Sequence, residues 1–199
     1  FNNDGLDAVK ERIAKNRPNG FLGINIGPNK DSKNKVEDYL ICLSKIYDQA
    51  EYITINISSP NTQGLRDLHE KKLFINLMEN IEKIKKKKNI TKPILVKISP
   101  DLNDENIADL VELIIRFKVE GIIISNTTDK NRQSLMDSKK NEIGGLSGKP
   151  LTEISTNIIK KFYKKLDGKA KIIGVGGIDS GQDVYEKIIA GANLVQLYT

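Results

Sequence analysis

Tryptophan is absent from the 199-residue sequence, and cysteine and histidine occur once each, as Cys42 and His69. A lone cysteine forms no internal disulfide and is compatible with a reducing compartment. Zinc sites, thiol enzymes and Ser-His-Asp triads need such side chains in polar loops, where the sequence does not supply them. We therefore expect no bound metal, a buried core thiol at Cys42, and a non-catalytic His69 at an exposed helix start.

Long apolar runs are also missing. Stretches such as Ile122 to Ile124 are far shorter than the roughly 20 residues that cross a bilayer. A hydrophobic content of 38% and a charged content of 29% are typical of a soluble globular protein, and the length favours a single domain. Because the chain starts at Phe1 and not at a methionine, we expect it to be an internal fragment of a longer protein.

The net charge of +6 owes much to the lysine run KIKKKKN at residues 83–89. A run of this kind could bind a polyanion or a lipid headgroup. Because no aromatic or arginine side chains interleave with the lysines, and because lysines suit the carboxyl end of a helix, we favour a solvated helix end. We expect no binding of nucleic acid.

Short β-branched runs recur along the sequence, and each is followed by a polar loop and then by helical periodicity. The runs are almost continuously apolar, which is the pattern of parallel strands buried on both faces. The predicted strands are residues 21–26, 52–57, 94–98, 121–125, 172–176 and 194–198. Helices are predicted at residues 32–48, after a cap at Asn103 or Asp104, and after a cap at Ser180.

This alternation fits two architectures, an open doubly wound sheet and a (β/α)8 barrel. A barrel needs eight strands and only six are predicted, so two would lie upstream of the chain. The connection between Ser125 and Thr152, about 25 residues long, exceeds the usual two to six residues. It predicts a lid over an active site.

Polar residues follow the carboxyl end of the first five predicted strands, in NIGPNKD, SSPNT, KISPD, SNTT and GGIDSG. Active sites are assembled at this edge in both architectures. The amides at this edge recognise planar heterocycles, and they are Asn25, Asn56, Asn61 and Asn126. Lys97 stands in an apolar strand and needs an anionic partner, because an unpaired buried ammonium costs several kcal/mol. The pattern indicates a cofactor that does the chemistry while the protein orients it.

Glycines at positions 174, 176 and 177 precede the helix that Ser180 is expected to cap. Glycine lets backbone N–H groups approach a phosphate closely, and the positive end of a helix favours the same anion. In barrels the loops after the seventh and eighth strands commonly hold a phosphate. We therefore expect a phosphorylated cofactor or substrate here.

Seven motifs together resemble dihydroorotate dehydrogenase, in its class 2 or quinone-dependent branch, and they follow the family's order along the whole chain. They are FNNDG, GINIGPNKD, NISSPNTQGLRDL, VKISPDL, SNTT, GGLSGKPL and IIGVGGIDSGQDVYEKIIAGANLVQLYT. The resemblance implies an incomplete TIM (β/α)8 barrel, about strands 3 to 8, forming one FMN-binding domain over residues 1–199 that is truncated at both ends. The implied activity is oxidation of (S)-dihydroorotate to orotate in de novo pyrimidine (UMP) biosynthesis, with FMN as hydride acceptor and a quinone as final electron acceptor.

The resemblance also implies roles for single residues. Class 1 enzymes carry a cysteine as base and class 2 enzymes a serine, so Ser59, which precedes Pro60, would take the proton from C5 of dihydroorotate while a hydride leaves C6. The implied substrate-binding residues are Phe1, Asn56, Asn61, Asn126 and Thr127. The implied FMN contacts are Asn25, Asn56, Lys97, Ser125 (where threonine is common in the family), Gly148, Gly177, Tyr198 and Thr199.

A class 2 enzyme implies a membrane quinone as partner. The resemblance therefore implies peripheral contact with the bacterial cytoplasmic membrane, or with the mitochondrial inner membrane in a eukaryote, through an N-terminal segment outside this chain. The chain itself is expected to be soluble. Two alternatives stay open: a class 1-like dihydroorotate or dihydropyrimidine dehydrogenase, and a catalytically inert barrel fragment that binds phosphate compounds through GVGGI.

Overall fold

Strands and helices alternate along the chain in a computed structural model that describes residues 3–130, 132–133 and 135–198. The strands are β1 (Gly23–Ile26), β2 (Tyr52–Asn56), β3 (Ile94–Ile98), β4 (Gly121–Ile124), β5 (Lys171–Val175) and β6 (Leu194–Gln196). The α-helices are α1 (Leu6–Lys15), α2 (Lys35–Ile46), α3 (Lys71–Lys88), α4 (Asp104–Arg116), α5 (Thr152–Leu166) and α6 (Gly181–Ile189). Short 3₁₀ turns are η1 (Tyr47–Gln49), η2 (Arg66–His69) and η3 (Lys149–Leu151).

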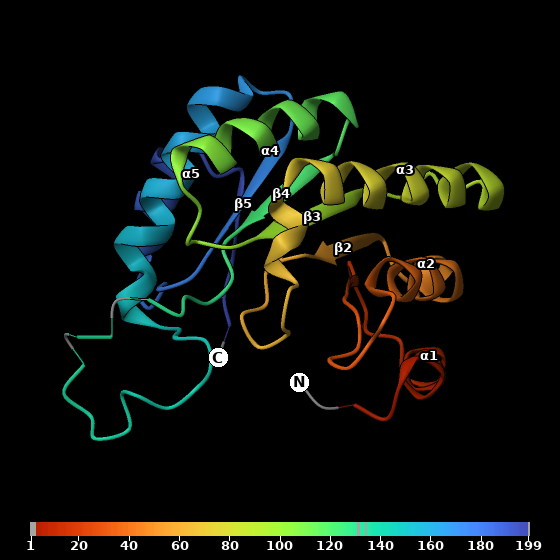
Figure 1. Cartoon of the computed structure of the whole chain (residues 1–199), viewed down its shortest axis with the longest axis horizontal. Coiled ribbons are helices and arrows are strands. Elements are labelled where there is room, and N and C mark those ends of the chain that lie inside the picture. The colour runs from red at the N-terminus through yellow and green to blue at the C-terminus, as the bar shows by residue number, and fades with distance from the viewer. Residues whose placement is uncertain (1–2, 131, 134, 199) are drawn as a thin grey trace.

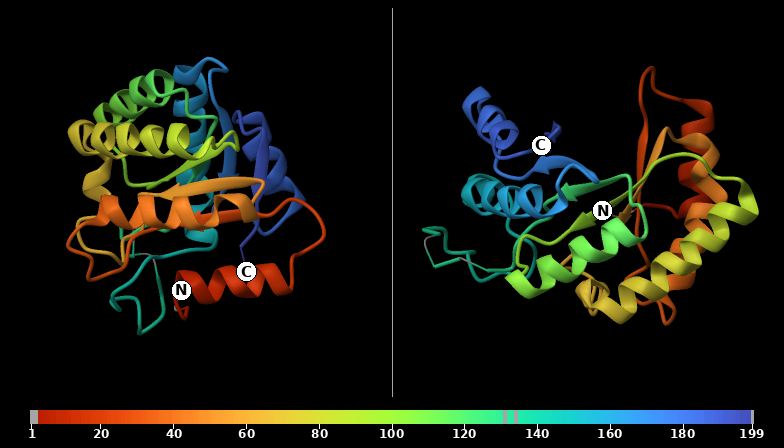
Figure 2. Two further views of the ribbon diagram at one scale, coloured as in Figure 1. Left: turned by 90° about the vertical axis from the view of Figure 1, so that its right-hand side faces the viewer. Right: turned by 90° about the horizontal axis from the view of Figure 1, so that it is seen from above.

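The strands form one parallel sheet in chain order from β1 to β6 (Figure 1). Figure 2 shows that the sheet curves into an arc with α2 to α6 on its convex side. A doubly wound sheet would carry helices on both faces and reverse its strand order. The structure therefore confirms the incomplete TIM barrel, and the open sheet is excluded.

Side-chain caps begin three of the helices. Asn34, Asn103 and Ser180 each accept a hydrogen bond from a backbone N–H in the first turn of α2, α4 and α6, respectively. Such caps satisfy N–H groups that have no partner within the helix. The predicted caps at Asn103 and Ser180 are confirmed, and the predicted strand ends lie within two residues of the observed ones.

Alternating strand residues face two different layers, because successive side chains point to opposite faces of a sheet. The main core lies between the sheet and the helices and includes Ile53, Ile55 and Val96. A small inner cluster lines the concave face and consists of Leu95, Ile123, Ile173 and Val175, with Tyr52 packed against it. The same face is polar at the carboxyl edge of the sheet. There Lys97 follows Leu95 by two residues in β3, and Asn56 follows Tyr52 by four residues in β2. The inner face is thus apolar at one end and polar at the other.

The long connection after β4 has structure of its own. Thr128 pairs with Leu146 in an antiparallel bridge, and the Arg132 guanidinium donates to the carbonyl groups of Lys140, Glu142 and Gly144. At its base Gly145 packs so closely that an added Cβ would lie 1.9 Å from Thr127 Oγ1. The loop therefore returns to the strand ends, where the Thr128–Leu146 bridge and the packing of Gly145 on Thr127 hold it.

Of two composition-based expectations, the buried thiol at Cys42 is met in part and the helix end at the lysine run is met in full. Cys42 is half-buried and packs against the main core, and burial raises the pKa of its thiol. Lys85 to Lys88 form the last turn of α3, where their charge suits the helix dipole and Lys86 to Lys88 are exposed. Across the described residues, no helix has both the length and the apolar character that spanning a bilayer requires.

Candidate functional site

An amide–hydroxyl cluster, Asn56, Ser58 and Asn126, bridges the ends of β2 and β4. Asn56 Oδ1 accepts from the backbone N–H and the hydroxyl of Ser58, at 3.2 and 2.9 Å. Asn126 Nδ2 donates to Asn56 Oδ1 at 3.2 Å and to Ser58 Oγ at 3.0 Å, and Asn126 Oδ1 accepts from the Thr127 N–H at 2.8 Å. Behind the cluster, the buried Tyr39 hydroxyl donates to the Asn56 carbonyl at 2.5 Å. The structure thus brings Asn56, Asn126 and Thr127 together, as the sequence predicted.

Ser59 lies next to this cluster at the rim and is half-buried. Its Oγ accepts a hydrogen bond of 3.3 Å from the backbone N–H of Asn61, whose side chain is exposed. Within the described residues, the Ser59 hydroxyl donates to no protein acceptor. Its proton is therefore available to a group outside the protein or to water.

Lys97 and Asn25 lie on the concave face of neighbouring parts of the sheet. Lys97 is paired with Asn56 across β2 and β3, and Asn25 is paired with Thr54 across β1 and β2. In the described part of the chain the Lys97 ammonium makes no hydrogen bond or ion pair, and burial lowers its pKa. A partly buried cation without a partner is suited to an anionic ligand.

Gly176 and Gly177 form a glycine turn after β5, with φ of 109° and 69°. Only glycine fits at position 177, because an added Cβ would lie 2.4 Å from the backbone N of Thr152, the first residue of α5. Thr152 Oγ1 donates to the Gly177 carbonyl at 2.6 Å. Gly148 directly precedes η3, which leads into α5, and open space lies where its Cβ would be. The sequence predicted that the helix after Ser180 points its positive end at a phosphate. In the structure the amino end of α5 also lies at the glycine turn.

Four predicted site residues remain, two in the described part of the chain and two outside it. Ser125 is buried at the end of β4, where its N–H donates to the Val175 carbonyl at 2.9 Å. Tyr198 is exposed, just beyond β6. Phe1 and Thr199 lie outside the described residues.

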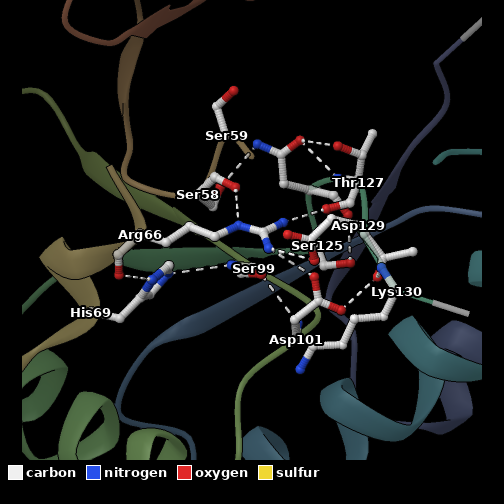
Figure 3. Close-up of polar contacts among 12 residues, drawn as sticks. Ser58, Ser59, Arg66, His69, Ser99, Asp101, Ser125, Thr127, Asp129 and Lys130 are labelled. Atoms are coloured by element: carbon white, nitrogen blue, oxygen red, sulfur yellow. Dashed lines mark hydrogen bonds and ion pairs between the residues drawn. The ribbon is translucent and has the colours of Figure 1, made fainter. Parts of the chain in front are cut away.

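Arg66 was not predicted as a site residue, yet it joins the loops after three strands (Figure 3). Its guanidinium donates to the carbonyl of Ser58 at 3.2 Å and to that of Thr127 at 2.9 Å. It also forms ion pairs of 2.9 Å with Asp101 and 3.0 Å with Asp129. We call this group the Arg66 clamp. It fixes the backbone on both sides of the amide–hydroxyl cluster.

His69 is not at an exposed helix start, so that prediction is wrong. Its side chain is buried because η2 turns inward together with Leu68. Nδ1 lies 2.7 Å from the Arg66 carbonyl, and the Ser99 N–H points at Nε2 at 3.4 Å. This pattern fits a neutral ring with its proton on Nδ1. Burial lowers the His69 pKa to about 4.

His69 should make the protein acid-sensitive. Its pKa of about 4 in the folded state is below the ordinary 6.5, so the unfolded chain binds the proton first as pH falls. Stability is therefore lost between pH 6.5 and 4, by up to about 3 kcal/mol. Urea unfolding of the full-length protein at pH 7.0, 6.0 and 5.0 measures this loss. His69→Gln should have lower stability at pH 7 and a flatter profile, and equal slopes for both proteins would contradict the assignment.

Comparison with known proteins places the chain in a family. All of residues 1–199 match the family model described as dihydroorotate dehydrogenase. The chain belongs to the dihydroorotate dehydrogenase family. Curated relatives include the dihydroorotate dehydrogenases (quinone) of Christiangramia forsetii, 45% identical over 201 residues, and of Wigglesworthia glossinidia brevipalpis, 47% identical over 208 residues. Both matches cover 100% of this chain, and they cover 58% and 61% of the relatives.

Solved structures of the dihydroorotate dehydrogenase family share the fold. The crystal structure of the Eimeria tenella enzyme in complex with ferulenol has a TM-score of 0.92 and 35% identity, and covers 100% of this chain and 60% of that one. The ligand-free form of the same protein gives a TM-score of 0.90 at 34% identity. The chain thus spans about three fifths of the length of the dihydroorotate dehydrogenases that it matches.

Proposed function

We propose that this chain is the FMN-binding barrel domain of a quinone-dependent dihydroorotate dehydrogenase, which oxidises (S)-dihydroorotate to orotate in de novo pyrimidine biosynthesis. The observation that carries the proposal is the amide–hydroxyl cluster beside Ser59 on the rim of the arc. The names of the Christiangramia and Wigglesworthia relatives support the same activity and the same electron acceptor.

The residues present fit FMN on two structural grounds. The partly buried Lys97 ammonium has no anionic partner among the described residues, and the glycine turn leaves no room for a side chain at Gly177. We assign Lys97, Asn25 and Asn56 to the flavin ring, and the turn with Gly148 to its phosphate. Ser125, Tyr198 and Thr199 complete the proposed set. Bound FMN supplies the hydride acceptor of the reaction.

The protein's own groups would orient the substrate and move one proton. Asn56, Asn61, Asn126 and Thr127 offer amide and hydroxyl groups to the pyrimidine and its carboxylate, with Phe1 in the same role. Ser59 Oγ would take the proton from C5. A serine hydroxyl is a weak base, so it needs a neighbouring group or water to accept its own proton. Within the described residues the Ser59 hydroxyl donates to no protein acceptor, which is compatible with such a proton transfer.

The electron acceptor separates this proposal from its alternatives. A serine at position 59, and not a cysteine, supports the quinone-dependent class. Quinones reside in lipid, so we extend the proposal to peripheral contact with the bacterial cytoplasmic membrane or the mitochondrial inner membrane, through an N-terminal segment outside this chain. Membrane co-sedimentation of the full-length protein tests this extension.

The activity is tested by mixing the full-length protein with dihydroorotate under anaerobic conditions. We expect bleaching of the flavin spectrum and its recovery on addition of a ubiquinone analogue, but not of fumarate or NAD. Recovery with fumarate or NAD alone would favour the class 1-like enzyme. A flavin that stays oxidised with dihydroorotate would favour an inert phosphate-binding barrel.

Lys97→Met should weaken flavin retention and slow flavin reduction. Without flavin, the same variant should gain up to about 1 kcal/mol of stability, because an apolar chain of similar length replaces a partly buried cation that has no partner among the described residues. Flavin content after gel filtration, single-turnover reduction and urea unfolding of the apoprotein measure the three effects. The exposed Lys171 on β5 provides the matched control, Lys171→Met. Normal flavin content with normal half-reaction rates in Lys97→Met would contradict this role.

A further inference from the structure

Lys187 on α6 is fully buried although it carries a charge. Its ammonium donates to Ser155 Oγ at 2.8 Å, to Thr156 Oγ1 at 3.0 Å and to the Thr152 carbonyl at 3.3 Å. All three acceptors are neutral and belong to the first turns of α5. Within the described residues, no carboxylate forms an ion pair with it. The hydrogen bonds of this cation are satisfied by neutral groups, and among the described residues no carboxylate is in direct contact with its charge.

The groups that hold Lys187 also hold the glycine turn. Ser155 Oγ, which accepts from Lys187, lies in hydrogen-bond contact with the Gly176 carbonyl at 2.9 Å. Thr152, whose carbonyl accepts from Lys187, donates its hydroxyl to the Gly177 carbonyl. The ammonium therefore stands directly behind the glycine turn, separated from it by single side chains.

A glycine inside β5 makes room for the lysine. A Cβ added at Gly174 would lie 3.2 Å from Lys187 Cδ and 3.0 Å from Ile159 Cδ1. Glycine in the middle of a strand weakens the strand, and it often marks a place where another group approaches closely. The stem of Lys187 passes through this space to reach the amino end of α5.

Two sources of positive potential meet at this place. The amino end of α5 carries the positive end of the helix dipole, which favours anions and disfavours cations. The buried Lys187 ammonium is the second source, and burial lowers its pKa. The charges that act on it come from Asp183 and Glu186 of its own helix, whereas the α5 groups in contact with it are uncharged. An anion at the glycine turn would balance both sources.

We propose that Lys187 is a positioning residue for the cofactor phosphate. It holds the amino end of α5 against the glycine turn and adds its charge from behind, so that the site selects a phosphorylated flavin over the same flavin without phosphate. This inference rests on the proposed function, and it concerns the affinity for one group of the cofactor. Lys187 does not itself touch the ligand.

The test compares FMN with riboflavin, which lacks the phosphate. Both are titrated into the full-length protein after removal of its flavin, and Kd is measured from the quenching of flavin fluorescence. Lys187→Gln keeps a hydrogen-bond donor and loses the charge. It should bind FMN about tenfold more weakly, which is the order of magnitude for losing the attraction between one partly screened unit charge and the phosphate. Its affinity for riboflavin should stay within about twofold. The exposed Lys164 of α5 gives the control, Lys164→Gln, which should change neither Kd.

The results that would overturn the inference differ from the result that would overturn the proposed function. An equal loss of affinity for both flavins, or no loss for either, would overturn the inference and leave the proposed function intact. A wild-type protein that binds neither flavin would overturn the proposed function and the inference with it. If Lys187→Gln does not fold, lysine Cε NMR titration of the wild-type protein decides. The pKa of Lys187 should rise with FMN but not with riboflavin, and equal values with both would overturn the inference.

Discussion

Replacing Ser59 by alanine in the full-length protein should slow the reduction of bound flavin by dihydroorotate by about 10² to 10⁴, the range for loss of a general base. Ser59 is half-buried and accepts a single hydrogen bond from the Asn61 N–H, so stability should change by less than about 0.5 kcal/mol. Anaerobic stopped-flow absorbance measures the reduction, and hydrogen exchange at C5 of the substrate measures proton abstraction directly.

Ser58→Ala is the matched control for this experiment. Ser58 is fully buried and bonds both Asn56 and Asn126. Its loss should cost about 1 kcal/mol of stability and raise KM, while the base at position 59 remains. Undiminished exchange at C5, or flavin reduction at the wild-type rate, in Ser59→Ala would remove Ser59 from the mechanism.

Replacing Arg66 by methionine should lower stability by about 3 kcal/mol and kcat/KM by about 10²-fold or more. The stability loss follows because Asp101, whose side chain is only 9% exposed, would keep its charge without its partner. The activity loss follows because the carbonyls of Ser58 and Thr127 would lose their shared donor, and small misplacements of reacting groups are costly. Urea unfolding and steady-state kinetics measure the two effects.

Two further variants test the origin of the Arg66 effect. Arg66→Lys keeps the charge but not the forked donor geometry, so it should recover part of the stability and little of the activity. Lys161→Met removes an exposed ion pair with Asp104 and should cost no more than about 0.5 kcal/mol. Wild-type kcat/KM in Arg66→Met would show that the clamp does not position the site.

Local patterns in the sequence were sufficient to locate the strands and several helices, whereas α1 was not predicted. Apolar runs marked each strand to within two residues, and Asn103 and Ser180 marked helix starts. The choice between barrel and open sheet was beyond such patterns, because both repeat the same strand–helix unit. That choice depends on how neighbouring strands twist and pack, which involves residues far apart in the chain.

The amide–hydroxyl cluster was predictable because parallel strands end at one edge, so that Asn56 and Asn126 must approach each other. The Arg66 clamp was not, since Asp101 and Asp129 lie 35 and 63 residues from Arg66. The signal available was an arginine among polar strand-end motifs, in GLRD. The burial of Lys187 was not predictable, because in the sequence it resembles any charged residue of a helix. The one indication was Gly174, a glycine within a strand, which leaves room for the Lys187 side chain.

The loop after β4 is fixed at its base and carries exposed apolar side chains further out. The Thr128–Leu146 bridge and the contact of Gly145 with Thr127 fix the base, whereas Met136 and Ile143 are almost fully exposed. Exposed residues of this loop that lie outside the contacts of Arg66 and Arg132 can therefore be exchanged without disturbing the strand ends. A fluorophore grafted at Lys139 would follow the loop as the protein takes up its ligands, while the groups that bind them stay unaltered.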